Sequence, residues 1–467
     1  RLKIILGLGD SYGSGEGSPD QPTKWKSNVK DKKWPIGSYG LQKVNGWVHT
    51  PAQWISNRCN RSYFSAQSLA SLKLAADDPH SIVSFVHLSC TGAEVVDGML
   101  APQRNAPGSE SNCRGTVIPS NSLINNPHAN TLNKINPKCD VPFSQVSSAV
   151  KLLCLVKPKS LPGSDLLSAK IKKELYGIQT YPHQISWIND LKFCPVESQI
   201  KPDLVLLSIG GNDIGFGGVV AWGIIPSEGK YKFTELMTAF ARKSGGVVCP
   251  DDTSGDCGGN LSATKRMDDL KKRYSALRQA FSSLLNVAEN KIVISGYTNP
   301  LFNSNGGICG NPPKSDSPNE WRLSKLLIPI IFKPSEWQFN LTGGEYPTGE
   351  ATLVNKWVVS KLNNKISSVV TGKDFNWLFV DNSSVMNNRG WCTDVDEDSE
   401  SLNFTPNKVY TWNAFTDRTR MIRTSNDSIM TQWRSEKNHD FLFGTFHPNV
   451  QGYSGMADQI MDKIYSK

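Results

Sequence analysis

Five short, largely apolar runs recur along the chain, and each is followed by small or polar residues. They are Leu2–Leu8, Ser81–Leu88, Asp203–Ile209, Lys291–Ser295 and Trp377–Asp381. Runs that are apolar throughout, rather than alternating, are typical of strands buried on both faces of a parallel sheet. Helical patterns stand between or after them, at Ala66–Ala76, Thr264–Glu289 and Val450–Tyr465. This order predicts an α/β fold: a doubly wound, flavodoxin-like parallel sheet of about five strands.

The strands are separated by unusually long stretches without a clear pattern. The chain has 467 residues, and its motifs lie at both ends and in the middle. We therefore predict one domain over residues 1–467 rather than two or three, with insertions near 18–56, 100–183, 218–263 and 299–349. Loops of this length in a compact domain are usually functional or separately braced.

Ten cysteines are dispersed along the chain, without a CxxC pair or a Cys/His cluster of zinc-ligand spacing. This pattern predicts disulfides formed in an oxidising compartment. The chain opens directly on a strand and has no signal peptide, which indicates that a leader has been removed or that the chain is a piece of a longer protein. No apolar run is long enough to cross a membrane. We expect a secreted or otherwise extracytoplasmic protein.

The formal net charge is +9, from 51 basic and 42 acidic residues. Such a balance predicts peripheral attraction to anionic surfaces. The basic clusters Lys24–Lys33 and Lys170–Lys173 are interpreted as solvated faces rather than binding patches. No nucleic-acid-binding motif is present, so we expect no nucleic-acid partner.

Three candidate site residues follow the first three strands. Ser11 lies in the glycine-rich turn 9–17 (GDSYGSGEG), where small neighbours leave its hydroxyl open; Gly92 and Asn212 follow the next two strands. Each turn alone is more often structural than catalytic. The carboxyl ends of parallel strands share one edge of the sheet, which brings the three turns together. A serine nucleophile beside amide donors for an oxyanion indicates ester hydrolysis.

His447 is the candidate general base. It precedes the C-terminal helical pattern, and Pro448 marks a fixed loop. Asp10 and Asp213, beside the motif residues, are interpreted as loop-bracing rather than catalytic.

In the order Ser, Gly, Asn and His, these four blocks resemble the SGNH, or GDSL, hydrolase superfamily. The resemblance implies that Ser11 is the nucleophile and His447 the base. It further implies an oxyanion hole formed by the Ser11 amide, the Gly92 amide and the Asn212 side chain. Most members carry an aspartate three residues before the histidine, where this chain has Gly444. We expect the Gly444 carbonyl to orient the ring instead; Asp440 and Glu436 remain alternative partners.

Four segments are most similar to the secreted actinobacterial esterase and phospholipase branch of the superfamily: 9–17 (GDSYGSGEG), 59–62 (CNRS), 90–93 (CTGA) and 210–216 (GGNDIGF). That branch implies a Cys59–Cys90 disulfide and, by the same analogy, Cys249–Cys257 and Cys309–Cys392. It also implies a monomer that hydrolyses lipid or phospholipid acyl esters through an acyl-enzyme, without a metal or other cofactor. A polysaccharide O-acetylesterase is the alternative, because 13 tryptophans are available to line a sugar cleft. A binding module that has lost activity is a third, less favoured hypothesis.

Overall fold

The computed structural model has a central sheet of five parallel strands in the order β4-β1-β7-β8-β9. The strands are β1 (Leu2–Gly9), β4 (Ile82–His87), β7 (Leu204–Ser208), β8 (Ile292–Ser295) and β9 (Leu378–Val380). All five predicted strands are present, and numbered along the chain their order is 2-1-3-4-5. The predicted doubly wound, flavodoxin-like fold is confirmed, and such folds bind ligands where the strand order reverses, here beside β1.

The structure describes residues 1–27, 47–103, 144–161, 165–178, 191–216, 262–308, 355–391 and 444–466, with residues 188, 218, 219, 393, 409–411, 420–423, 428, 431 and 432. Most of the predicted insertion 218–263 lies outside this part of the chain, and so do large parts of the other three. The single domain over 1–467 stays a prediction.

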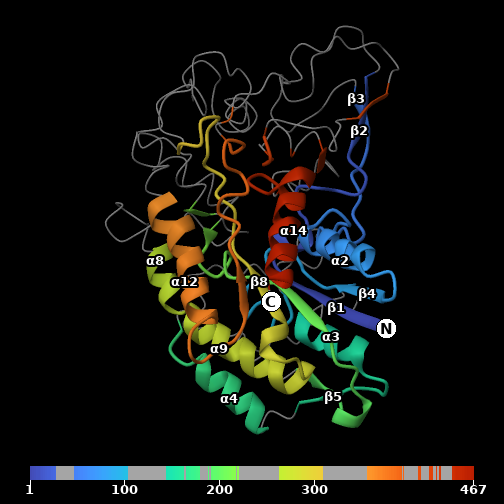
Figure 1. Cartoon of the computed structure of the whole chain (residues 1–467), viewed down its shortest axis with the longest axis vertical. Helices are drawn as coiled ribbons and strands as arrows, with labels where there is room; N and C mark the ends of the chain where they lie inside the picture. The colour runs from blue at the N-terminus through green and yellow to red at the C-terminus, as the bar shows by residue number, and fades with distance from the viewer. Residues whose placement is uncertain are drawn as a thin grey trace, which may run out of the picture.

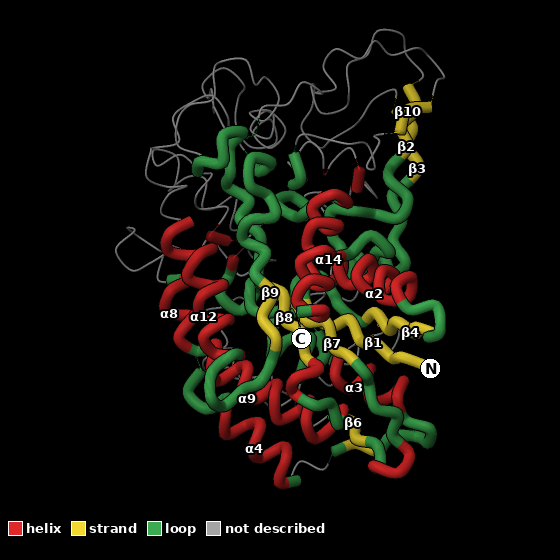
Figure 2. Tube along the Cα trace, in the orientation of Figure 1, coloured by secondary structure: helices red, strands yellow, loops and turns green. Residues whose placement is uncertain are grey.

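Helices cover both faces of the sheet (Figure 1). Helices α2 (Ala66–Asp77) and α14 (Val450–Tyr465) pack against each other on one face. Figure 2 shows α3 (Gln145–Leu153) and α9 (Leu270–Ala280) on the other face, and α4 (Leu166–Glu174) packs on α9. Helix α12 (Ser360–Val370) contacts both α9 and β9. With both faces covered, β7 and β8 are almost wholly buried, as their apolar sequences predict.

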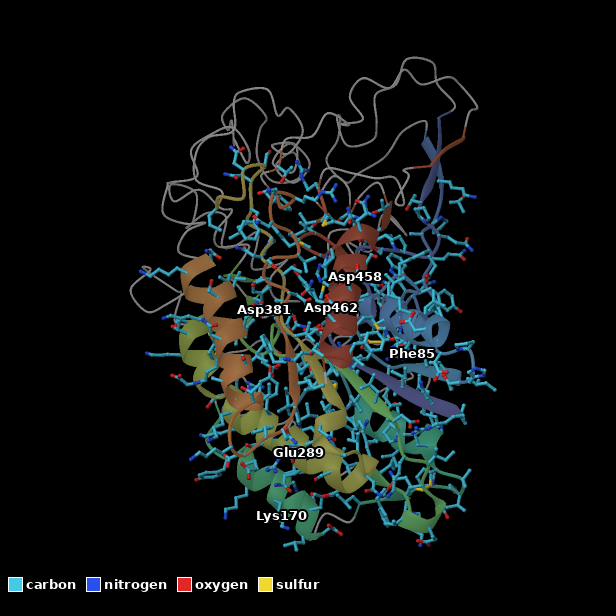
Figure 3. The ribbon with its side chains drawn as sticks, in the orientation of Figure 1. Phe85, Lys170, Glu289, Asp381, Asp458 and Asp462 are labelled. Carbon is cyan, nitrogen blue, oxygen red and sulfur yellow. A yellow bond between two sulfur atoms is a disulfide. The ribbon has the colours of Figure 1, made fainter. Side chains whose placement is uncertain are left out.

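The C-terminal helix has the predicted bounds, because its cap and its periodicity agree. The Asn449 side chain accepts a hydrogen bond from the Gly452 amide at 3.0 Å, which satisfies one of the free donors at the helix start. Met456 and Ile460 are buried on one side, whereas Asp458 and Asp462 lie on the exposed side (Figure 3). The buried side contacts α2, β8 and β9.

The helix predicted over Thr264–Glu289 is divided in the structure. It consists of α8 (Ala263–Asp268) and α9, which continues into a wider π-helical turn at Phe281–Leu285. That turn ends at Asn286, whose φ of 51° lies in the left-handed region that asparagine tolerates better than most residues. The helical segment therefore ends at Leu285, before the predicted end at Glu289.

Two small sheets lie outside the central one. Strands β2 (Lys24–Ser27), β3 (Trp47–Thr50) and β10 (Val409–Thr411) form an antiparallel sheet in the order β10-β2-β3. Strands β5 (Lys159–Ser160) and β6 (Lys192–Phe193) pair beside a Cys154–Cys194 disulfide. This disulfide fits the expectation that the insertions are braced. Lys170 and Lys173 are exposed on α4, in agreement with a solvated basic face (Figure 3).

Candidate active site

Ser11 begins the short helix α1 (Ser11–Ser14) directly after β1. The Asp10 carboxylate caps this helix by accepting a hydrogen bond from the Tyr12 amide at 3.0 Å. Gly9 has a φ of 135°, and a Cβ on it would come within 1.9 Å of the Ser208 carbonyl oxygen. Only glycine therefore permits β1 to lie this close to β7 and turn sharply. The turn places Ser11 at the first position of a helix, 8% exposed.

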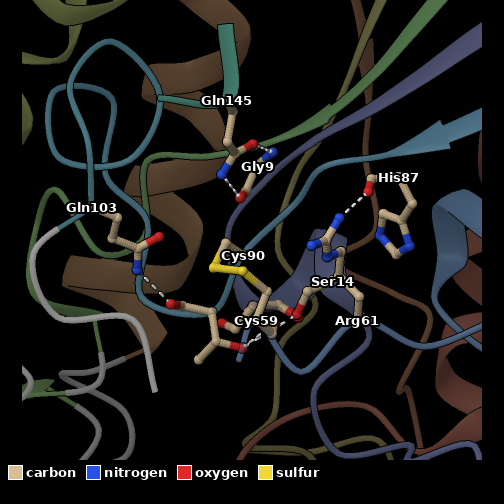
Figure 4. The surroundings of a disulfide bond; sticks show 10 residues. Gly9, Ser14, Cys59, Arg61, His87, Cys90, Gln103 and Gln145 are labelled. Atoms are coloured by element: carbon tan, nitrogen blue, oxygen red, sulfur yellow. Dashed lines mark hydrogen bonds between the residues drawn. A yellow bond between two sulfur atoms is a disulfide. The ribbon is translucent and has the colours of Figure 1, made fainter. Parts of the chain in front are cut away.

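The end of β4 is fastened to the Ser11 turn (Figure 4). The Cys90 amide donates to the Gly9 carbonyl at 2.9 Å, and Cys90 forms the expected disulfide with Cys59. One residue further on, the Thr91 and Ser14 hydroxyls lie 3.3 Å apart. Gly92 then adopts a φ of 80°, a conformation that favours glycine. The Cys59–Cys90 prediction is confirmed; Cys249–Cys257 and Cys309–Cys392 lie outside the described residues.

The main-chain amides of Ser11 and Gly92 follow β1 and β4. Among the described residues, neither amide donates to another main-chain carbonyl. Gln103, whose side chain donates to the Thr91 carbonyl at 2.7 Å, holds the second turn in place (Figure 4). Ser11 is buried whereas Gly92 is exposed, and an amide at a strand end that is not paired within the fold is suited to bind an anionic oxygen.

Asn212 follows β7 and reaches the same turn. Its side-chain amide donates to the Ala93 carbonyl at 3.0 Å, one residue beyond Gly92. The neighbouring Asp213 is fully buried, forms an ion pair of 2.7 Å with Arg273 and accepts a hydrogen bond from the Val95 amide. Asp213 therefore braces the second turn against the third, as the sequence predicts, while Asn212 supplies an amide donor.

Tyr297, which the sequence analysis did not identify, joins the first turn to the third. It lies two residues after β8, and its hydroxyl donates to the Asp10 carboxylate and accepts a hydrogen bond from the Gly211 amide at 2.7 Å. Asn363 of α12 fixes the main chain of Tyr297 through two hydrogen bonds of 2.8 Å. Burial raises the pKa of Asp10 to about 7, although its hydrogen bonds oppose the rise. The sequence feature that could have identified Tyr297 is its place just after the fourth predicted strand.

His447 packs against the Ser11 turn from the far end of the chain. Its ring lies 5.3 Å from the Tyr12 ring, centroid to centroid. The Tyr12 hydroxyl also donates to the Phe446 carbonyl at 3.0 Å. A Cβ on Gly17 would approach the His447 Cβ to 3.0 Å, so glycine is needed there. The fold thus brings Ser11, Gly92, Asn212 and His447 into one neighbourhood of connected turns.

The ring of His447 is oriented by a different carbonyl from the one expected. Nδ1 lies 3.0 Å from the Thr445 carbonyl oxygen, whereas the Gly444 carbonyl accepts the main-chain amide of His447 at 3.1 Å. The reason is the turn itself: Phe446 has a φ of 64°, and the Gly444 carbonyl is used to close the turn. The expectation for Gly444 is therefore corrected to Thr445. Asp440 and Glu436 lie outside the described residues.

Burial lowers the pKa of His447 to about 4, and the hydrogen bond with Thr445 opposes this effect only in part. The ring is therefore neutral at ordinary pH. With its Nδ1–H donated to Thr445, the other nitrogen, Nε2, carries the lone pair and can accept a proton. Nε2 lies 3.6 Å from Oε2 of Glu16, a buried residue of the Ser11 turn.

Within the described residues, no group of three or more His, Cys, Asp or Glu side chains is arranged to hold a metal ion. No helix among the same residues has the length and apolar character of a membrane span.

Two solved structures of Streptomyces proteins align with nearly the whole chain. Phospholipase A1 of Streptomyces albidoflavus NA297 is 15% identical, with a TM-score of 0.37 and 100% of each chain covered. The extracellular lipase of Streptomyces rimosus is 12% identical, with a TM-score of 0.38 and 99% of each chain covered. No protein-family model and no curated protein sequence matches the chain. The assignment of the site therefore depends on the residues themselves.

Proposed function

We propose that the protein is an SGNH-type serine carboxylic ester hydrolase. The observation that carries this proposal is the contact of His447 with the Ser11 turn. A histidine from the end of the chain meets the helix start that bears the serine, and a carbonyl holds its Nδ1 at 3.0 Å. A nucleophile, a base with a fixed tautomer and two or more aimed donors are the parts that acyl transfer requires.

The reaction would proceed in two halves. Ser11 Oγ attacks the ester carbonyl carbon while its proton passes to Nε2 of His447, and the carbonyl oxygen becomes an oxyanion. The Ser11 amide, the Gly92 amide and the Asn212 side chain donate hydrogen bonds to that oxygen. His447 then gives the proton to the departing alcohol, leaving an acyl-enzyme, and water attacks this ester by the same route in reverse. No metal ion or other cofactor enters these steps.

For the natural substrate, we favour lipid or phospholipid acyl esters over acetylated polysaccharide. The lipid preference follows from the sequence resemblance of the four motif blocks. The alternative, a polysaccharide O-acetylesterase, was based on tryptophans that could line a sugar cleft. The structure describes three tryptophan side chains, and all three are buried: Trp54, Trp377 and Trp391. Packed in the core, these three side chains do not line a sugar cleft. The two described disulfides fit the proposed secretion.

Hydrolysis of p-nitrophenyl esters of increasing chain length tests the proposal. We expect turnover by the wild-type protein, covalent labelling of Ser11 by a fluorophosphonate, and loss of both in Ser11→Ala. Folded wild-type protein without turnover or labelling would support the binding-module hypothesis instead. A preference for acetate over decanoate, with release of acetate from an acetylated glycan, would favour the O-acetylesterase.

A further inference from the structure

Glu16 is the one acidic side chain for which the described residues show an approach to the proton-accepting nitrogen of His447. The backbone brings it there: after α1, the amides of Gly15 and Glu16 both donate to the Ser11 carbonyl, at 3.1 and 3.2 Å. The chain therefore folds back over Ser11, and Glu16 Oε2 comes within 3.6 Å of His447 Nε2. Glu16 is fully buried, so this approach takes place away from bulk water.

Two further contacts fix the position of the Glu16 carboxylate. The Asn60 side chain donates to Oε1 at 3.2 Å, so that Oε2 is the oxygen directed at His447. Asn60 is itself held next to the Cys59–Cys90 disulfide and has a φ of 47°. The Tyr453 hydroxyl of α14 donates to the Glu16 carbonyl at 2.6 Å. Side chain and main chain are thus both anchored, so the carboxylate is held in place before any substrate arrives.

The chemistry of the proposed reaction supplies a reason for this arrangement. When His447 accepts the Ser11 proton, a positive charge forms on a partly buried ring, and the Thr445 carbonyl supplies only a dipole on the Nδ1 side. A full negative charge close to Nε2 favours the charged ring much more than a carbonyl does. At position 444, three residues before the histidine, where most of the SGNH superfamily carries an aspartate, this chain has glycine.

On this basis, and resting on the proposed function, we infer that Glu16 is a positioning residue that stabilises the protonated ring of His447 from the Nε2 side. In this role the carboxylate acts as a fixed negative charge and exchanges no proton. In the step that it assists, the Ser11 O–H bond breaks and the His447 Nε2–H bond forms, while Ser11 Oγ bonds to the ester carbonyl carbon and the carbonyl π bond opens to the oxyanion. The acid that is missing beside Nδ1 is replaced by one from the turn of the nucleophile.

Other titratable or charged groups pack around this pair and belong in the test. Tyr12 of α1 lies beside the ring, and burial raises its pKa above the ordinary value. Burial also raises the pKa of Tyr453 of α14 above the ordinary value. Arg423 donates its Nε–H to the Gly17 carbonyl at 2.7 Å and pairs its main chain with His447. Both phenols are neutral at ordinary pH, so among the described residues Glu16 is the acidic group that faces Nε2.

The decisive variant is Glu16→Gln, which keeps the shape and an oxygen for Asn60 but removes the charge. We expect the pKa of His447, followed by NMR of the ring, to fall by about 1 or more relative to wild type. For each unit by which the pKa of His447 falls, we expect kcat/KM for p-nitrophenyl acetate on the pH plateau to fall by about tenfold. The KM of the variant should stay within about twofold of the wild-type value. Glu16→Asp, which keeps the charge, should recover part of both effects.

Asn60→Ala is the matched control, because it disturbs the same buried contact while leaving the carboxylate in place. If Glu16 were only structural, Asn60→Ala and Glu16→Gln would lose activity alike and the pKa of His447 would be the same in both. An unchanged pKa of His447 in folded Glu16→Gln would overturn the inference. The NMR titration needs no turnover, so wild-type protein without esterase activity would refute the proposed function separately.

Discussion

The hydroxyl of Tyr297 donates a hydrogen bond to the buried carboxylate of Asp10. The same hydroxyl accepts a hydrogen bond from the Gly211 amide, so one phenol ties the turn after β1 to the turn after β7. Ser11 follows Asp10 and Asn212 follows Gly211 directly in sequence. The distance between the candidate nucleophile and the candidate oxyanion donor is therefore set by a side chain that follows a third strand, β8 (Ile292–Ser295).

Tyr297→Phe removes this link while keeping the ring. Asp10 loses a donor and the Gly211 amide loses its acceptor, which we expect to cost about 1–3 kcal/mol of unfolding free energy. Because the Asn212 turn is no longer held, kcat should fall by roughly tenfold, since small displacements of donors are costly to catalysis. Urea unfolding and ester kinetics measure the two effects. Full activity at reduced stability would show that the link is only structural.

Asp10 should make the folded protein less stable as the pH rises from about 4 to about 7. Its pKa is raised from 3.8 to about 7 by burial, so the folded state binds the proton more tightly than the unfolded state does. Unfolding free energy therefore falls through this window, by at most about 4 kcal/mol, and is flat above it. Urea titrations from pH 4 to 8 should show a smaller slope in Asp10→Asn. Equal slopes in both proteins would contradict the prediction.

Esterase activity should persist in mild acid. Burial lowers the pKa of His447 to about 4, and only the neutral ring can accept the Ser11 proton. Activity is thus present above this pKa and lost as the pH falls through it. The acid limb of kcat/KM, measured with an uncharged ester, should have its midpoint well below 6.5, the ordinary value for histidine. Tryptophan fluorescence at each pH separates loss of the base from unfolding, and a midpoint at or above 6.5 would refute the assignment.

Asn212→Ala should lower kcat by roughly 100- to 1,000-fold, because a donor to the developing oxyanion is lost, with KM changed much less. The Asn212 side chain also donates to the Ala93 carbonyl, so thermal unfolding must be measured alongside. Asn376→Ala is the control: this asparagine is exposed just before β9, and its replacement should leave the kinetics unchanged. Retention of full activity by Asn212→Ala would remove Asn212 from the oxyanion hole.

The two disulfides within the described residues should differ in their effect on activity. Each closes a loop of comparable length, with separations of 31 and 40 residues, so each double alanine variant should lose about 2–4 kcal/mol of stability. The Cys59–Cys90 variant should also lose activity, because Gly92 follows Cys90 closely. The Cys154–Cys194 variant should keep its kcat below its melting temperature. Parallel melting curves and kinetics test this, and equal kinetic losses would contradict it.

Several features followed from local sequence. Apolar runs predicted all five central strands, and their alternation with helices predicted the parallel topology. The predicted bounds of α14 agree with the structure, because cap and periodicity coincide there. The helix predicted over Thr264–Glu289 is present but divided and ends early, at Leu285, because a left-handed asparagine follows it and periodicity does not register backbone conformation.

The neighbours of the site depended on the tertiary structure. Sequence placed Ser11, Gly92, Asn212 and His447 at strand and helix ends, where a doubly wound sheet collects its functional residues. It could not choose the Thr445 carbonyl over Gly444, since one positive φ at Phe446 decides which carbonyl faces the ring.

Sequence alone thus determined the strands and the turns that carry the candidate chemistry, because these follow from residue periodicity and small-residue spacing along the chain. Tertiary structure decided which side chains surround them. Glu16 at His447, Tyr297 at Asp10 and the Cys154–Cys194 bond are pairings that spacing does not specify. Contacts between distant segments arise only when the packed core fixes their separation. For this reason the approach of Glu16 to His447 is seen only in the tertiary structure.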